Sequence, residues 1–539
     1  MKCRRLITTC ILIFNLSIIP LPAVSSTTLP QAARLGKVSF VNSCSLRVQV
    51  ELNSAVAMLH SFQYGLAEKT FTHVAQKEPQ CAIAYWGAAM TLYHQLWDWP
   101  SAETLKKGRE YLEKARPLRK TERERAYLNA AEAFYQPLRN LGPVSRVQAY
   151  SKAMLDLHER YPQDDDATAF YALSLLALPA AGDDGLANNR SAVAILTDLF
   201  AVQPEHPGAA HYLIHAADAP ELASLGLAAA LRYAQIAPSS PHALHMPAHI
   251  FVRLGMWQES IVSNLASLAA ADEATRSQRD DGSGDALHAM MYLSYSYLQS
   301  GEHEDARQVV EHIKTVPGAT ANSVANNLAI FEALYAVETH EWKQAATLTL
   351  QPAAFPYAKL RTFWARAIGA ARTGDLVSAR QNVEQLDQAR ARMLANTRGR
   401  EGQIHTCHSV DSDVTVQQLE AKAWLAWAEG RPTEALETMQ AAATRETFYA
   451  VESRTIPAYE MLGDLLLELH QPKPALMAYE AALKEAPARF NALTGAARAS
   501  LALGNSEQAR FYYAALVKCC GPGVTRKEFR EARSFLSGN

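Results

Sequence analysis

A small residue recurs along this chain of 539 residues, and three of its spacings are 34 residues (226 to 260, 345 to 379 and 475 to 509). Where the second helix of a hairpin crosses the first, a larger side chain would push the two helices apart. The positions with this property are Ala67, Gly226, Ser260, Ala306, Ala345, Ala379, Ala435, Ala475 and Ala509. The recurrence predicts an all-α solenoid of tandem antiparallel helix hairpins, about ten to twelve in number, with almost no strand.

Glycines and prolines stand where such hairpins would turn. A glycine with positive φ can end the first helix of a hairpin, and the candidates are Gly255, Gly301, Gly374, Gly430 and Gly504. Proline cannot continue a helix, and the prolines expected to close second helices are Pro79, Pro204, Pro238 and Pro487.

The segment from Ile456 to Pro487 carries the most complete repeat. Its matching positions are Tyr459, Leu462, Gly463, Leu466, Ala475, Tyr479, Ala482 and Pro487. This pattern resembles the tetratricopeptide repeat (TPR), and the resemblance implies a right-handed superhelix whose concave groove binds ligands. Five further stretches resemble a group of exported bacterial TPR proteins with no established activity: VNSCS (41–45), CAIAYWGAAMTLYHQLW (81–97), HPGAAHYLIHAAD (206–218), PHALHMPAHIFVRLGMW (241–257) and LHAMMYLSYSYLQSG (287–301).

The N-terminus has the order of a secretory signal peptide. Lys2, Arg4 and Arg5 precede the apolar run Leu6–Pro22, and small residues follow at 23–26. That order predicts cleavage near residue 25 and a periplasmic or secreted protein. The apolar run is short for a membrane span, so we expect no stable span after cleavage.

The repeat pattern and its interruptions divide the chain. The expected parts are a signal peptide (1–25), N-terminal TPR-like repeats (40–100), irregular helical hairpins (101–205), histidine-rich repeats (206–310), further repeats (320–384), a polar insertion (385–415) and C-terminal TPR repeats (416–535). His405, Cys407 and His408 in the insertion have metal-like spacing, but a solvent-exposed loop is the better interpretation.

Cysteine usage fits an oxidising compartment. Cys44 lies just before the first helix of its hairpin and Cys81 at the end of the second, and an antiparallel hairpin brings these points to one edge. We therefore expect a Cys44–Cys81 disulfide. The sequence leaves the pairing of Cys407, Cys519 and Cys520 open.

Histidines are concentrated in one part of the chain, since six of the 17 fall within residues 206–249. If two tandem units begin at Pro207 and Pro241, a pair occupies positions 5 and 9 of each: His211 with His215, and His245 with His249. Residues spaced i,i+4 share a helix face. We expect these four imidazoles to converge in one concave pocket, with His242, His288 and Asp218 at its rim.

Three interpretations of this pocket stay open. Imidazoles at i,i+4 have the spacing of metal ligands, and an N4 site, or an N3O site completed by Asp218, suits Zn²⁺, Cu²⁺ or Fe²⁺ equally. Protonatable imidazoles can also bind an organic anion or a peptide end. Alternatively, the histidines simply hydrogen-bond within a polar groove.

Aromatic residues mark two further places on the expected groove. Trp86 and His94 are either packing residues or an apolar wall for a ligand. Farther along, a mixed aromatic and acidic surface is expected from Glu420, Trp424, Trp427, Glu460 and Asp464.

Two functions are consistent with these patterns. The first is a scaffold that binds a peptide, protein or small ligand in its groove; the alternative is a metal-binding protein or metal-dependent enzyme that uses the histidines. No catalytic motif such as GxSxG or HExxH occurs, so enzymatic activity stays undecided. With 52 Lys and Arg against 54 Asp and Glu, no basic field favours nucleic acid as a partner.

Exported material should lack the signal peptide. We expect N-terminal sequencing of the protein recovered outside the cytoplasm to begin near residue 25, because the small residues at 23–26 follow the apolar run. A secreted chain that still begins at Met1, or a cytoplasmic location, would contradict this.

Overall fold

The computed structural model describes residues 34–97, 99–136, 142–179, 186–277, 282–397, 407–446 and 456–538, with side chains for 34–395 and 414–538 of these. The expected signal peptide (1–25) and His405 lie outside the described residues. All regular structure within the described ranges is helical, as predicted. None of the described helices is long and apolar enough to cross a membrane.

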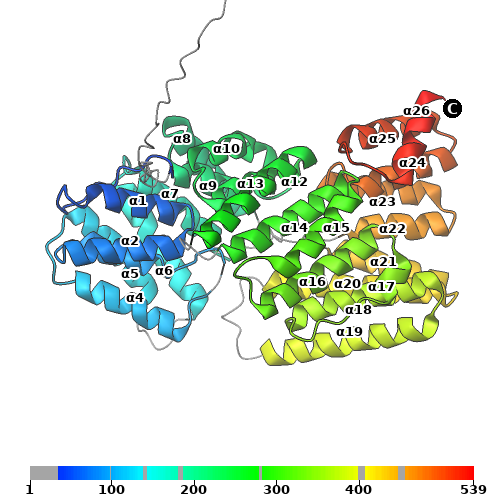
Figure 1. Cartoon of the computed structure of the whole chain (residues 1–539), viewed down its shortest axis with the longest axis horizontal. Coiled ribbons are helices and arrows are strands. Elements are labelled where there is room, and N and C mark those ends of the chain that lie inside the picture. Colours follow the sequence, from blue (N-terminus) through cyan, green and yellow to red (C-terminus); the bar gives the residue numbers. More distant parts are fainter. Residues whose placement is uncertain are drawn as a thin grey trace, which may run out of the picture. The chain divides into compact units, whose positions relative to one another are not determined.

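Successive helices pair as antiparallel hairpins, each beside the one before it (Figure 1). The first four hairpins are α1 Gln49–His60 with α2 Tyr64–Lys77, α3 Ala82–Met90 with α4 Ala102–Ala115, α5 Glu122–Tyr135 with α6 Pro143–Arg160, and α7 Asp165–Leu176 with α8 Ala187–Val202. The next three are α9 Pro207–Ala217 with α10 Ala223–Ile236, α11 Pro241–His245 and α12 Pro247–Arg253 with α13 Trp257–Arg276, and α14 Ser283–Gln299 with α15 His303–His312 and the 3₁₀ turn η1 Ile313–Thr315.

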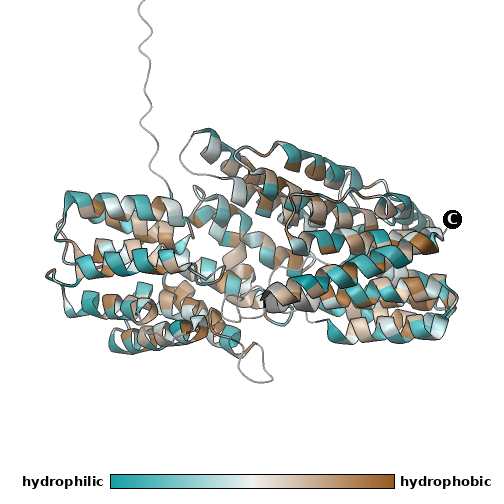
Figure 2. Ribbon diagram, turned by 90° about the horizontal axis from the view of Figure 1, so that it is seen from below, coloured by the Kyte–Doolittle hydropathy of each residue, from teal (hydrophilic) through white to brown (hydrophobic). Residues whose placement is uncertain are grey.

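The remaining hairpins continue the array to the C-terminal helix. They are α16 Ala321–Glu338 with α17 Trp342–Ala346, α18 Pro356–Thr373 with α19 Leu376–Thr397, α20 Cys407–Ala428 with α21 Pro432–Arg445, α22 Ala458–Glu468 with α23 Pro472–Glu485, and α24 Phe490–Ala502 with α25 Ser506–Cys519, followed by α26 Lys527–Ser537. Individual helices carry both hydrophilic and hydrophobic residues (Figure 2), as expected for helices with one packed face.

The repeat positions behave as predicted. All nine small residues lie in second helices of hairpins and are buried. At Gly226 an added Cβ would come within 2.8 Å of the Ala217 Cβ, which explains why the crossing needs a small residue. The five turn glycines all have positive φ, between 69° and 84°. Each of the four prolines stands two residues after the end of a second helix.

Much of the segment expected as a polar insertion, 385–415, belongs to helices. Residues up to Thr397 continue α19, and α20 begins at Cys407. Where side chains are described, α19 buries Leu386 and α20 buries Val414. Cys407 and His408 are thus in a helix, and their side chains are outside the described set.

The cysteines near the N-terminus form the expected bridge. Cys44 and Cys81 are disulfide-bonded, with their Cα atoms 5.0 Å apart. Cys519 and Cys520 both stay as free thiols, which answers part of the question that the sequence left open.

The array returns on itself at two places, which the repeat pattern does not predict. The end of α1 contacts α9: Tyr233 donates a hydrogen bond to Ser61 (3.2 Å), and the His60 carbonyl accepts one from His211 (2.6 Å). Farther on, Trp257 donates to the Ala488 carbonyl (3.0 Å), just before α24. Both contacts join residues more than 150 positions apart, so the inner face of the solenoid is closed where they occur.

Turn glycines should differ in their tolerance of a side chain. Around Gly504 a Cβ would meet nothing within 4 Å, so Gly504→Ala should cost only the positive φ, about 1 kcal/mol. Gly301→Ala adds clashes with Val524 and Phe490 and should cost about 2–3 kcal/mol. Gly504→Pro, which cannot adopt the φ of +74°, should cost about 3 kcal/mol or more.

Urea unfolding followed by circular dichroism measures all three variants. Equal losses for the two alanine variants would contradict the proposed difference between an open and a crowded turn.

Candidate metal centre

Four helices bring six histidines to one place in the interior. α9 supplies His211 and His215, α11 supplies His242 and His245, α12 supplies His249 and α14 supplies His288. Pro207 and Pro241 are the first residues of α9 and α11, and the preceding His206 and Ser240 accept N-capping hydrogen bonds. These caps fix where each helix begins and therefore which way its histidines point.

Pro247 interrupts the helix between two of the histidines. It separates α11 from α12, because proline lacks the N–H that would bond to the carbonyl of Ala243. His245 and His249 thus lie at the end of one short helix and the start of the next.

The first histidine group consists of His211, His215 and His242, all buried. One candidate ligand nitrogen from each lies within 4.8 Å of the other two. The Nε2 atoms of His211 and His242 are 3.0 Å apart. Two nitrogens that bind one ion at about 2.0–2.1 Å, with 90–110° between the bonds, lie about 2.9–3.4 Å from each other. The pair therefore has the spacing of two ligands of one metal ion.

His215 completes the first group with an unsatisfied atom. Its Nε2 is buried and has no hydrogen-bond partner. A buried polar nitrogen without a partner costs about 1–3 kcal/mol, so something must compensate at this point in the working protein.

The second group consists of His245, His249 and His288, whose candidate ligand nitrogens also lie within 4.8 Å of one another. His245 and His249 again face each other through Nε2 atoms 3.0 Å apart. The hydroxyl of Tyr292, one turn after His288 on α14, is 3.2 Å from the His249 Nε2. His288 is the one member of the six that is partly exposed.

Hydrogen-bond acceptors outside the groups fix the tautomers of three imidazoles. The Nδ1–H of His211 donates to the His60 carbonyl (2.6 Å), that of His245 to the Asn264 side-chain oxygen (2.7 Å), and that of His249 to Asp218 (2.7 Å). With Nδ1 as the donor, a neutral imidazole carries its lone pair on Nε2. Such partners are characteristic of metal-binding histidines, because they orient the ring and make the ligand more basic.

Asn264 and Asp218 are themselves held in place. The Asn264 amide donates to the Ser260 carbonyl (2.7 Å), which leaves its oxygen toward His245. Asp218 also accepts a hydrogen bond from Arg253 (2.8 Å). Asp218 is therefore a buried residue that orients His249, and it neither lies at a rim nor completes an N3O site as expected.

Burial keeps the first group neutral. It lowers the pKa of His211 to about 3, with the His60 carbonyl opposing the shift. Burial also lowers the pKa values of His215 and His242 well below the usual range, and neighbouring histidines lower them further. Neutral imidazoles are the form that binds metal.

An aromatic lid covers the first group. It consists of Phe62, Tyr64, His94 and Trp97. The Phe62 ring lies 4.4 Å from His211 and 5.7 Å from His242, measured between centroids, and Trp97 packs edge-on at 5.4 Å from His242. Phe62 has a φ of +55°, a conformation unusual for a residue with a side chain. The turn after α1 thus adopts a strained conformation directly over the histidines.

The outcomes for the predicted residues differ. His211, His215, His245 and His249 converge as expected, but they divide between two groups instead of forming one N4 site. His242 belongs to the first group and is buried, and the partly exposed His288 belongs to the second. Trp86 stacks on Phe40 in the core, 5.3 Å between centroids, so it is a packing residue and not a ligand wall. His94 stacks on Tyr64 in the lid, with the ring centroids 4.3 Å apart.

A third cluster shows how a fully satisfied histidine network differs. His60 donates to Asp166 (2.9 Å) and accepts from Tyr212 (3.0 Å). His206 donates to Asp166 (3.3 Å) and accepts from the Ala209 N–H (3.2 Å). The two histidines lower the pKa of Asp166, against the effect of burial. The three residues also have the spacing of metal ligands, but every ring nitrogen here already has a protein partner.

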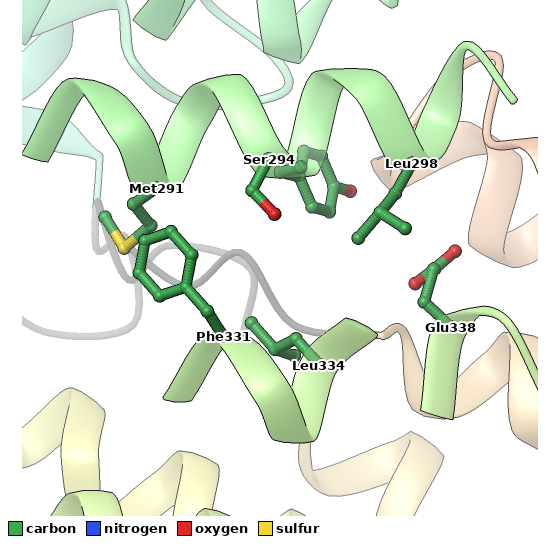
Figure 3. Close-up of a pocket in the computed structure, with 7 residues that line it drawn as sticks. Met291, Ser294, Leu298, Phe331, Leu334 and Glu338 are labelled. Atoms are coloured by element: carbon green, nitrogen blue, oxygen red, sulfur yellow. The ribbon is translucent and has the colours of Figure 1, made fainter. Parts of the chain in front are cut away.

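Two cavities lie away from the histidines. A space of about 10 Å³ between α14 and α16, lined by Met291, Phe331 and Glu338 among others (Figure 3), holds one water at most. A larger cavity of about 440 Å³ lies in the C-terminal repeats and has the size of a small-molecule site. Its lining includes Arg372, Trp424 and Asp464, two of which belong to the surface expected from the sequence. Glu420 and Glu460 are buried instead, bonded to Trp364 and Arg489.

The fold and the centre together define an all-helical repeat protein with a buried polyhistidine site. No family model and no curated protein sequence matches the chain. Similar solved structures include the human IFIT1 dimer with m7Gppp-AAAA, 10% identical with a TM-score of 0.38, over 86% of this chain and 94% of that one. A monomeric mutant of IFIT1 with Gppp-AAAA is 10% identical with a TM-score of 0.39, over 88% of this chain and 97% of that one. Those ligands belong to IFIT1 and are not assigned to this chain.

Asp464 should make stability depend on pH. Burial first, and then the Glu460 carboxylate, raise its pKa to about 7, although the Tyr479 hydroxyl and Arg372 oppose the shift. The folded chain therefore binds this proton more tightly than the unfolded chain, whose Asp has a pKa of about 3.9. The stabilising contribution is complete below pH 4 and disappears as the pH rises to 7. We therefore compare the stability of Asp464→Asn with that of wild type at each pH. The difference should shift in favour of the variant between pH 5 and pH 8.

The free energy of unfolding at both pH values measures this effect. Asp375→Asn is the control, because hydrogen bonds to Ser378 lower the pKa of Asp375 and it stays ionised throughout this interval. An equal difference from wild type at both pH values for Asp464→Asn would contradict the prediction.

Proposed function

We propose that this chain is an exported helical-repeat protein that binds a transition-metal ion at its buried histidines. The observation that carries the proposal is the His215 Nε2, which is buried without a hydrogen-bond partner beside the 3.0 Å pair of His211 and His242. A metal ion bound to the three nitrogens would satisfy all of them at once. In the cluster around Asp166, by contrast, no ring nitrogen lacks a protein partner.

The donor set limits the metal. Imidazole nitrogens suit Zn²⁺, Cu²⁺ and Fe²⁺, and those remain the candidates from the first group alone. Three protein ligands leave one coordination position open, which is the arrangement of catalytic rather than structural zinc sites. A metal-dependent activity is therefore compatible with the site, although no reaction is assigned to it.

Export is supported by two independent features. Residues 2–26 have the order of a signal peptide. The Cys44–Cys81 disulfide is of a kind that persists outside the reducing cytoplasm. A periplasmic or secreted location agrees with both.

A second candidate function is the binding of a peptide, protein or small ligand in the groove. The cavity of about 440 Å³ favours it. There Arg372 lies 4.5 Å from the Trp424 ring centroid and donates to Glu468 (2.8 Å), while its Nε and Nη1 are buried without hydrogen-bond partners. These N–H groups can donate to an anionic group of a ligand. This function becomes the better proposal if the protein carries no metal.

Metal analysis of the exported chain, purified without a histidine tag, tests the proposed function. We expect bound transition metal in the wild type and a loss of at least tenfold in affinity for His211→Ala and His215→Ala, because each removes one of three ligands. His158→Gln is the control, since it alters a partly buried histidine that bonds Thr168 and belongs to neither histidine group. His73→Ala controls for the surface.

The controls should retain the wild-type metal content, and circular dichroism should show whether each variant folds. Folded wild-type protein that takes up no Zn²⁺, copper or Fe²⁺ would reject the proposal, as would full metal content in both ligand variants.

A further inference from the structure

We propose that the six histidines hold a pair of copper(I) ions, three imidazoles to each, and that the pair takes up one molecule of dioxygen. This inference rests on the proposed function and extends it to a second ion, a metal identity and a ligand. It starts from the second group, His245, His249 and His288. The ion of the proposed function, which His211, His215 and His242 would bind, leaves this group unused.

The second group repeats the chemistry of the first. Each has two Nε2 atoms 3.0 Å apart and a third imidazole whose candidate ligand nitrogen is within 4.8 Å. In the second group both members of the close pair donate through Nδ1, to Asn264 and to Asp218. Both Nε2 atoms then carry lone pairs that face each other, and a shared cation removes that repulsion.

The two groups are direct neighbours. The ring centroids of His215 and His249 are 5.8 Å apart, and those of His242 and His245 are 6.2 Å apart. His242 and His245 come from the same short helix, α11, and contribute to different groups. The break at Pro247 then lets α12 turn His249 back toward His245. Two ions bound here would be close enough to interact.

Charge favours copper(I) over a pair of divalent ions. All six candidate ligands are imidazoles, which bind a metal in their uncharged form, and the nearby carboxylate of Asp218 is already paired with Arg253 (2.8 Å). Repulsion scales with the product of the charges, so two divalent ions repel each other four times as strongly as two monovalent ions at the same distance. Two divalent ions together carry a charge of 4+, and none of the six ligands carries a negative charge that would offset it. Imidazole nitrogens are suitable ligands for copper.

Two neighbouring copper(I) ions can supply two electrons together. Dioxygen takes one electron from each ion, so both become copper(II) while O₂ becomes peroxide. The O–O bond is kept and no proton is needed. Because five of the six histidines are buried, a ligand that reaches both ions must be small. Dioxygen meets that condition, and the partly exposed His288 lies on the side nearest to solvent.

The test uses the full exported chain, without a histidine tag, loaded anaerobically with copper(I). We expect two copper ions per chain, uptake of one O₂ per copper pair, and no copper(II) signal in electron paramagnetic resonance afterwards, because the two spins couple. His288→Ala and His215→Ala should each bind one copper ion and, once oxidised, give the signal of an isolated copper(II). His158→Gln, which lies outside both groups, should behave as wild type.

The outcomes separate the two proposals. No bound metal in folded wild type rejects both the proposed function and this inference. If the chain binds one copper ion, or prefers a divalent metal to copper(I), the proposed pair of copper(I) ions is wrong and the proposed function stands. Two copper ions that take up no O₂, or that give two full isolated copper(II) signals after oxidation, overturn the joint action of the ions. Circular dichroism identifies any variant that fails to fold, and the wild-type copper count does not depend on the variants.

Discussion

The hydrogen bond from His211 to the His60 carbonyl joins the first and fifth hairpins across 151 residues of sequence. It directs the His211 Nε2 inward, toward His242, and it anchors the turn that carries Phe62 over the histidines. The closure of the first hairpins against α9 therefore produces both the orientation of the ligands and their burial. Without it the same histidines would line an open groove.

Residues whose roles depend on neighbouring repeats were predictable. Small residues such as Ala475, the turn at Gly504 and the side-by-side pairs His211 with His215 and His245 with His249 all follow from a 34-residue period. Each of these depends on contacts within a hairpin or between adjacent hairpins. A solenoid fixes such contacts locally, because each repeat packs only against its neighbours.

Contacts between distant repeats could not be predicted in the same way. The period does not specify how much each hairpin turns relative to the last, so it could not indicate that α1 returns to α9. For that reason Phe62 was missed, and Trp86 was expected in a groove although it lies in the core. His242 was placed at a rim that does not exist. A positive φ at a non-glycine turn residue has no sequence signature of its own.

The two closures also differ in chemistry, and the difference bears on how an ion could reach the centre. At the second closure Arg489 is buried between Glu338 (2.7 Å) and Glu460 (2.7 Å), an ionic contact within the protein. At the first, Phe62 and Trp97 cover ligands that the metal itself would hold together. An ion that enters from this side must displace the turn after α1, so the folded chain should take up and release it slowly. Metal content would then reflect the history of the protein as well as the affinity of the site, because a bound ion is retained for as long as that turn stays docked.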